Sequence, residues 1–265
     1  MFDPASPLIA VDIGNSRIKL GLFDEPPADG ALPVPRRVLD LQSGELDGTR
    51  LRAWLPTEPV WPQWRVASVN RPAAERLFHW IDAECRTPAG TPAPARLLTH
   101  GDFPLRVDLE HPERVGTDRL AAAAAANRLR TAGRAAIIVD FGSAITVDLL
   151  SEAGSFCGGA IFPGIDMAAR ALSEFTDLLP LVTLSQLSEP PPALGVSTVG
   201  AIRGGLFWGA IGAVRELIAR SSADLSRPPE VFLTGGAAGH LAAPLRLAAR
   251  HEPHLVLSGV AIAEV

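Results

Sequence analysis

Cysteine is rare in this 265-residue sequence, which contains Cys85, Cys157 and no tyrosine. Two cysteines are too few for a disulfide framework and lack the spacing of metal ligands, so no disulfide is expected. The start, MFDPASP, has an acidic residue and two prolines where a secretory signal has a basic residue and an apolar run. No uncharged apolar stretch reaches the roughly 18–20 residues of a spanning helix. These absences predict a cytoplasmic protein with no membrane partner.

Positive charge is also scarce. The 24 Lys and Arg residues are outnumbered by 29 Asp and Glu residues, which gives a net charge of −5. Because a nucleic-acid-binding surface needs an excess of positive charge, nucleic acid is not expected as a partner. Lysine occurs once, as Lys19. Hydrophobic residues make up 47% of the chain and charged residues 20%, a composition that supports a folded core, and the length favours two lobes.

Several common active-site sequences are missing. Neither GxxxxGK[ST] nor a strand followed by GxGxxG occurs, which argues against P-loop and Rossmann nucleotide sites. The six histidines form no HExxH, and no serine lies in a GxSxG turn. Zinc hydrolases and serine hydrolases are therefore disfavoured.

One short pattern occurs twice. Residues 8–19, LIAVDIGNSRIK, and residues 136–147, AIIVDFGSAITV, share an apolar run, then Val-Asp-x-Gly, then a second alternating apolar run. Each copy predicts a β-hairpin with glycine at the turn. A single Val-Asp-x-Gly could recur by chance, but two copies, each opening a strand-rich half, favour a duplicated domain. The sequence therefore predicts a two-lobed α/β protein.

A first helix is predicted over residues 117–130, TDRLAAAAAANRLR, which consists mostly of strong helix formers. Either Thr117 or Asp118 could be its N-cap.

Further elements are predicted in the second half of the chain. Residues 198–220 have helical apolar periodicity, with glycines that permit close helix packing. Residues 231–241 predict a strand, a Gly-Gly turn and a helix start. The last residues, 254–265, predict a closing strand with a short helical tail.

The first hairpin turn carries the groups of a phosphate site. Asp12 lies at a strand end and is followed by Gly14, Asn15 and Ser16. Such a carboxylate can hold hydrated Mg²⁺ while turn amides and hydroxyls bind phosphate oxygens. The alternative is that Asp12 only caps the turn. Lys19 either binds phosphate as a compact charge or is a solvated strand residue.

The second hairpin repeats the acid, the glycine and the hydroxyl as Asp140, Gly142 and Ser143. Two acidic hairpins facing each other across a cleft could hold both ends of a triphosphate and its cation. Asp118 either caps its helix or orients and deprotonates an attacking hydroxyl, with Arg119 holding an anionic group of the acceptor.

In combination, these motifs resemble the type III pantothenate kinases of the actin-like ATPase superfamily. The resemblance implies an α/β fold with two ribonuclease H-like lobes from a duplicated domain and an interlobe cleft. It divides the chain into an N-terminal lobe, residues 1–115, and a C-terminal lobe, residues 116–265, which includes an interlobe helix over 117–130. The matching blocks are VDIGNSRIKLGLFD at 11–24, HPERVGTDRLAAAAAA at 111–126, IIVDFGSAITVD at 137–148, GGAIFPG at 158–164 and STVGAIRGG at 197–205.

The function implied by this resemblance is ATP-dependent phosphorylation of pantothenate to 4'-phosphopantothenate, the first step of coenzyme A biosynthesis. A homodimer would use ATP, Mg²⁺ and a monovalent cation, K⁺ or NH₄⁺. The alternative is a non-catalytic, nucleotide-binding accessory or regulatory protein of the same family. That alternative is favoured by Leu109, which stands where the family has an aromatic residue.

The resemblance also assigns roles to residues. Asp118 would be the proton acceptor, and Asp140 would hold the monovalent cation. Thr198, contributed across the dimer interface, would complete the pantothenate site, and it is preceded by Ser197 where the family often has Asn. The other substrate-binding residues would be Gly116, Thr117, Asp118 and Arg119. The ATP-binding residues would be Asp12, Ile13, Gly14, Asn15, Ser16, Arg17, Ile18, Lys19 and Ser143, of which Ser16 and Ser143 replace the family's usual Thr.

Overall fold

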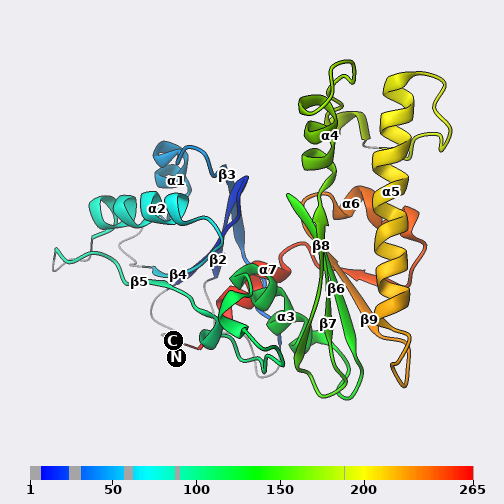
Figure 1. Cartoon of the computed structure of the whole chain (residues 1–265). Coiled ribbons are helices and arrows are strands. Elements are labelled where there is room, and N and C mark those ends of the chain that lie inside the picture. Colours follow the sequence, from blue (N-terminus) through cyan, green and yellow to red (C-terminus); the bar gives the residue numbers. More distant parts are fainter. Residues whose placement is uncertain (1–6, 24–30, 57–61, 87–89, 188, 265) are drawn as a thin grey trace. The chain divides into compact units, whose positions relative to one another are not determined.

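The computed structural model describes residues 7–23, 31–56, 62–86, 90–187 and 189–264 (Figure 1). The chain divides into two compact units. Unit one consists of Met1–Leu129 and His254–Val265, and unit two of Arg130–Pro253. Each unit has its own five-stranded sheet.

The sheet of unit one has the strand order β3-β2-β1-β4-β5. Strands β1, β2 and β3 are antiparallel neighbours, whereas β4 and β5 run parallel to β1. The predicted first hairpin is confirmed as β1 and β2. The strands are β1 (Leu8–Ile13), β2 (Arg17–Phe23), β3 (Arg37–Gln42), β4 (Gln63–Ser68) and β5 (Ala95–Leu97).

Both faces of this sheet are covered. Ile13, Ile18 and Leu41 share a hydrophobic core with buried side chains of α1 and α2. Because side chains alternate along a strand, the neighbouring residues face the other side, where Leu257 of α7 packs on β2 at Gly21. Figure 1 shows α1 and α2 together, away from α7. The helices of unit one are α1 (Gly48–Trp54), α2 (Arg71–Glu84), α3 (Thr117–Leu129) and α7 (Leu255–Ala261).

Unit two repeats the topology of unit one. Its strand order, β10-β9-β6-β7-β8, is that of the first sheet when β6 takes the place of β1. Strands β6, β7 and β8 are antiparallel neighbours, and β9 and β10 run parallel to β6. The elements are β6 (Ala136–Phe141), β7 (Ala144–Leu150), β8 (Phe156–Pro163), α4 (Ile165–Glu174), α5 (Thr198–Ser221), β9 (Glu230–Thr234), α6 (Ala238–Leu245) and β10 (Ala249–His251). The predicted fold class, two ribonuclease H-like lobes from a duplicated domain, is thereby confirmed.

The end of the chain differs from the prediction. Residues 255–261 form helix α7 and no strand, and the closing strand is β10, which comes before them. All seven residues of α7 are buried, so the segment is apolar on every side and has no amphipathic period. Helix α3 also groups with unit one, so the contacts divide the chain after Leu129 and not after residue 115.

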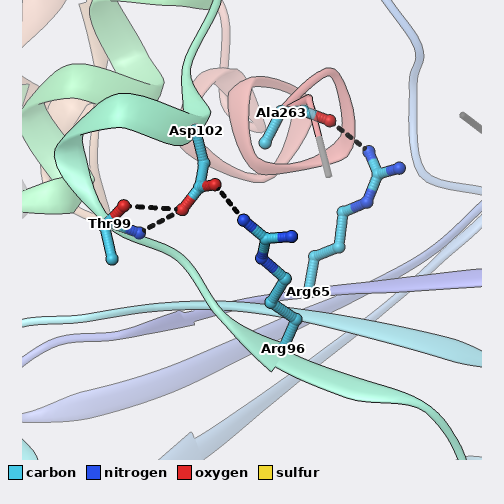
Figure 2. Close-up of polar contacts among 5 residues, drawn as sticks. All are labelled: Arg65, Arg96, Thr99, Asp102 and Ala263. Carbon is cyan, nitrogen blue, oxygen red and sulfur yellow. Dashed lines mark hydrogen bonds and ion pairs between the residues drawn. The ribbon is translucent and has the colours of Figure 1, made fainter.

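The chain end is fixed by buried polar groups (Figure 2). The guanidinium of Arg65 on β4 donates to the carbonyl oxygens of Ala261 at 2.6 Å and Ala263 at 2.8 Å. The amide of Glu264 donates to the carbonyl oxygen of Asp102 at 2.7 Å. The Asp102 carboxylate in turn accepts hydrogen bonds from Arg96 and Thr99. These bonds hold the end of α7 against β4 and the loop after β5.

Neither cysteine forms a disulfide, and no described helix could span a membrane. Both cysteines are free thiols, and Cys85 is buried. Burial raises the pKa of Cys85 to about 11. Within the part of the chain that the structure describes, no helix combines the length and the apolar character needed to cross a membrane.

Helices α3 and α7 touch through their backbones. A Cβ atom added to Gly259 would overlap the carbonyl oxygen of Ala121. We therefore expect Gly259→Ala to lower the free energy of unfolding by about 1–3 kcal/mol, because the helices would have to separate. Urea denaturation measures this change. Gly239→Ala on α6, where a Cβ meets no atom within 4 Å, is the control and should leave the free energy unchanged or slightly raised. Equal stability of the Gly259 variant and the unchanged protein would contradict the packing argument.

Candidate functional site

The first hairpin turn joins β1 to β2. The amide of Gly14 donates to the carbonyl oxygen of Arg17 at 2.9 Å, which closes the turn. Asp12 pairs with Lys19 across the two strands, and Lys19 pairs with Asp40 on β3. Since directly opposed residues share a face, these three charged side chains form one row on the face away from α1 and α2. This row places two acids and the single lysine of the chain next to the turn.

Arg17 is the second cation at this turn. Its Nη1 lies 2.9 Å from Oδ2 of Asp40, and the two side chains are 56% and 40% exposed. An exposed pair of this kind contributes little to stability. Its effect is to fix where the guanidinium lies beside the turn.

The start of α3 lies at the same edge of the sheet as this turn. Ile13, the last residue of β1, pairs with Ser68, the last residue of β4. The Ser68 amide donates to the hydroxyl oxygen of Thr117 at 3.0 Å. Asp118, in the first turn of α3, therefore lies beside the strand ends that carry Asp12. The structure thus brings together the residues assigned to phosphate binding in unit one and those assigned to the acceptor.

The start of α3 also answers the question of its N-cap. The amides of Arg119 and Leu120 donate to the carbonyl oxygen of Gly116 at 3.1 and 3.2 Å, so Gly116 is the N-cap of α3. The Thr117 hydroxyl is bonded to the end of β4, and Oδ1 of Asp118 accepts from the adjacent Arg119 amide at 2.8 Å. The expectation that Thr117 or Asp118 is the N-cap was therefore wrong. The Asp118 carboxylate still bonds a backbone amide of the first turn and so stabilises the start of the helix, which does not exclude its proposed role as a proton acceptor.

Asp118 is partly buried, and desolvation raises the pKa of its carboxyl above the ordinary value. The hydrogen bond from the Arg119 amide and the charge of Arg119 act in the opposite direction but do not cancel this effect. A Cβ atom at Gly116 would overlap Oδ1 of Asp118, so the glycine leaves the space that the carboxylate occupies. A carboxyl with a raised pKa is a better proton acceptor than an exposed one.

The second hairpin is β6 and β7, with Asp140 at the end of β6. Asp140 pairs with Thr146 on β7 and with Thr234 on β9. A Cβ atom on Gly235 would overlap Oδ1 of Asp140, and the φ angle of Gly235 is +93°. The backbone of Gly235 therefore packs directly against this carboxylate oxygen, an approach that a side chain would prevent. The Asp140 carboxylate supplies oxygen atoms, the ligand type that a hard cation takes.

No group of three or more His, Cys, Asp or Glu side chains that could hold a metal ion occurs among the described residues. A Mg²⁺ ion is normally held by one or two carboxylates, phosphate oxygens and water. The residues of the first turn fit this pattern, because Asp12 supplies one carboxylate and the nucleotide would supply the phosphates.

Thr198 is the first residue of α5 and is exposed. The residue before it, Ser197, is the N-cap, and its Oγ accepts from the Gly200 amide at 3.1 Å. Asn and Ser are both strong N-cap residues, so Ser197 can replace the family's Asn in this role. Asp140, Ser143 and Thr198 belong to unit two, whereas the other assigned site residues belong to unit one.

Sequence reasoning missed several residues near the first turn. Ser43 and Asn70 donate to the Gly14 carbonyl oxygen, at 2.7 and 3.5 Å. His254, which precedes α7, is partly buried, and its pKa is lowered first by burial and then by the charge of Lys19. Each lies far from the turn along the chain. No local pattern in the sequence could have joined them to it.

Comparison with known sequences decides the family. A sequence model for the type III pantothenate kinases matches residues 8–220. The chain belongs to the type III pantothenate kinase family. The type III pantothenate kinase of Anaeromyxobacter sp. (strain K) is 40% identical to this chain over 258 residues, which cover 96% of this chain and 97% of the relative. That of Dehalococcoides mccartyi (strain 195) is 33% identical over 258 residues, covering 96% of both chains.

Solved structures share the fold of this pantothenate kinase family member at low sequence identity. The PilM-PilN type IV pilus biogenesis complex contains a chain with a TM-score of 0.52 and 11% identity, covering 98% of each chain. The ethanolamine utilization protein EutJ from Carboxydothermus hydrogenoformans has a TM-score of 0.50 and 14% identity, covering 97% of this chain and 89% of that one. At these identities the likeness concerns the fold alone.

The raised pKa of Asp118 predicts how stability depends on pH. Its folded-state pKa lies above the unfolded value of about 3.9, so its contribution to stability is complete below that value and is lost as pH rises through the folded pKa. Asp118→Asn has no ionisable group at this position and therefore does not lose stability in this way. The variant should therefore gain stability over the unchanged protein at about pH 7, and the gain should shrink toward about pH 4. Urea denaturation at several pH values measures it. Asp82→Asn on an exposed position of α2 is the control, and a gain for Asp118→Asn that does not vary with pH would refute the prediction.

Proposed function

We propose that this protein transfers the γ-phosphoryl group of ATP to pantothenate, giving 4'-phosphopantothenate and ADP, in the cytoplasm. The relatives that carry the name type III pantothenate kinase support this reaction. The observation that carries it is the position of Asp118 at the sheet edge formed by Ile13 and Ser68, where the first hairpin turn also lies. A phosphate-binding turn and a proton acceptor at one edge are what phosphoryl transfer to an alcohol requires.

Each group at this edge has a proposed role. The residues from Asp12 to Lys19 bind the phosphates, with Lys19 and Arg17 supplying positive charge. The carboxylate of Asp118 accepts a hydrogen bond from the pantothenate hydroxyl and orients its oxygen toward the γ-phosphorus. As the new P–O bond forms and the bond to ADP breaks, the hydroxyl proton passes to Asp118. Gly116, Thr117 and Arg119 complete the acceptor site.

Two cations belong to the proposal. Mg²⁺ would bind beside Asp12, where it neutralises phosphate charge. A monovalent cation, K⁺ or NH₄⁺, would bind at Asp140, and Ser143 would contact ATP. The Asp140 carboxylate, an oxygen ligand packed against the Gly235 backbone near the end of β6, supports the cation assignment.

A homodimer is the proposed assembly, with α5 at the contact between two copies. Gly205, Gly209 and Gly212 lie one helical turn apart on α5, and a Cβ on any of them would meet no atom of the chain within 4 Å. Leu194 and Val196, just before α5, are 85% and 101% exposed. A stripe of glycines beside exposed apolar side chains fits close packing against a second copy. Such a contact would also let Thr198 of one copy reach the pantothenate site of the other.

The reaction is tested by ADP release from the purified protein with ATP, Mg²⁺ and K⁺, with and without pantothenate. Release should depend on pantothenate and should fall in tetramethylammonium buffer without K⁺. Asp118→Asn should lower kcat by about 10²–10⁴-fold, because the hydroxyl loses its proton acceptor. Near-normal turnover of this variant would overturn the role of Asp118.

The same assay separates the alternative function. Binding of ATP without pantothenate-dependent ADP release would favour a nucleotide-binding accessory protein. In that case Leu109→Tyr, which restores the family's aromatic residue, is the first variant to assay.

The dimer is tested by light scattering after size-exclusion chromatography. The unchanged protein should show twice the 27.9 kDa mass of the chain. Gly209→Arg should give the mass of one chain and lose pantothenate-dependent turnover, because a long charged side chain keeps the two helices apart. Gly239→Arg on α6 places the same side chain at another open glycine and should leave the dimer intact. A monomeric unchanged protein, or a Gly209→Arg dimer, would exclude this interface.

A further inference from the structure

We propose that Ser43 is a positioning residue for ATP: its hydroxyl fixes the Gly14–Asn15 peptide so that the Asn15 N–H points to the side where the phosphates bind. This inference rests on the proposed function, in which the first hairpin turn holds the phosphates of ATP. It adds a residue outside the turn, and outside every motif found in the sequence, to the nucleotide site.

Ser43 is bonded to the turn through both of its donors. It follows the last residue of β3 and is 1% exposed. Its amide donates to the carbonyl oxygen of Ser16 at 3.0 Å, which extends the β2–β3 pairing by one residue. Its hydroxyl donates to the carbonyl oxygen of Gly14 at 2.7 Å. The Ser43 carbonyl oxygen accepts from Arg76 of α2, so the serine is itself held from the helix side.

These bonds decide which way the Gly14 carbonyl points. Asn70, the N-cap of α2, also donates to this oxygen through Nδ2, at 3.5 Å. Both donors lie on the side of the sheet that α2 covers, because Asn70 begins α2 and Ser43 is bonded to Arg76 within it. The Gly14 carbonyl therefore points to the α2 side.

The direction of the next amide follows from peptide geometry. In a trans peptide the C=O and N–H bonds point in opposite directions, and the described chain contains no cis peptide. With the Gly14 carbonyl on the α2 side, the Asn15 N–H points to the other side. That is the side of Asp12 and Lys19, which alternate with core residues facing α2. The Asn15 N–H and the side chains of Lys19 and Asp12 thus lie on the same side of the sheet.

The bond has a consequence for ATP affinity. Asn15 is exposed, and Gly14 has no Cβ, so the Gly14–Asn15 peptide can rotate when nothing holds its carbonyl. A peptide that is already oriented costs no ordering free energy when the phosphate binds. Ser43 therefore acts through Gly14 and touches no substrate atom.

The second hairpin provides an internal comparison. Gly164 follows β8 as Ser43 follows β3, and its amide donates to the carbonyl oxygen of Ser143 at 3.0 Å. The backbone hydrogen bond to the serine carbonyl of the turn is thus present in both units. The side-chain hydroxyl, that of Ser43, is present only in unit one. A Cβ atom on Gly164 would overlap the carbonyl oxygens of Gly142 and Ser143, so unit two has no space for a serine there. Of the two hairpin turns, only the one that is proposed to bind phosphate has its glycine carbonyl held by a serine hydroxyl from this position.

The test is Ser43→Ala, which removes the bond to Gly14 and retains the amide bond to Ser16. We expect the Kd and KM for ATP to rise about tenfold, the effect of one lost hydrogen bond and a less ordered peptide. The Kd for adenosine, which has no phosphate, should stay within about twofold, as should KM for pantothenate and kcat at saturating ATP. Isothermal titration calorimetry and the ADP-release assay measure these values. Ser43→Thr retains the hydroxyl and should restore ATP affinity.

A control and a second variant separate this effect from general damage. Ser155→Ala removes a buried serine from the β7–β8 turn of unit two and should leave ATP affinity unchanged. If Ser43→Ala does not fold, Asn70→Ser carries the test. It keeps a good N-cap for α2, removes the second donor to Gly14, and should weaken ATP while leaving adenosine unchanged.

Two outcomes would overturn the inference. One is equal ATP affinity of Ser43→Ala, or of Asn70→Ser where that variant carries the test, and the unchanged protein. The other is an equal loss of affinity for ATP and adenosine, which would indicate a structural role only. Failure of the unchanged protein to bind ATP at all would instead refute the proposed function, so the two failures are distinguishable.

Discussion

The backbone contact between Gly259 and Ala121 is the constraint on which unit one depends. It lets α7 lie between the sheet and α3, where an alanine at this position would force the two helices apart. Arg65 fixes the other end of α7 through the carbonyl oxygens of Ala261 and Ala263. Because α3 lies against α7 and its Thr117 is bonded to the end of β4, Asp118 starts at the sheet edge that carries the first turn. The last residues of the chain therefore determine where the proposed proton acceptor lies.

The parts of the fold that the sequence predicted are those with a local signal. Both hairpins follow from an apolar run, a glycine turn and a second alternating run within 12 residues, and both are present as β1–β2 and β6–β7. The duplication followed from comparing the two copies, and the strand orders agree with it. Helices α3 and α5 were predicted from composition and periodicity, which are likewise properties of adjacent residues. The residues proposed for phosphate binding in the first turn rest on the same kind of local signal.

The features that could not be predicted depend on contacts between distant residues. Helix α7 was expected to be a strand with a helical tail, because an apolar run that is buried on all sides has no period to distinguish the two. The cap of α3 was misassigned because the Thr117 hydroxyl is taken by Ser68, which is 49 residues away. Ser43 is 29 residues from the carbonyl of Gly14 that its hydroxyl contacts. The strand order determines which of these distant residues meet, and a local sequence pattern does not reveal the strand order.

The two hairpins share a strand topology but differ in the residue that lies opposite the acid. Where the first has Lys19 opposite its acid, the second has Thr146. In the first hairpin the Ser43 hydroxyl donates to the Gly14 carbonyl oxygen. In the second, Gly164 takes the place of this serine, and there is no space for a side chain. The first turn thus combines a cation with an oriented amide, which fits an anion. The second keeps Asp140 with Thr146 opposite it, and a carboxylate with no lysine opposite it fits a cation. In the proposed function, one duplicated hairpin would bind phosphate in one unit and a monovalent cation in the other, through changes at a few positions that leave the strand pairing intact.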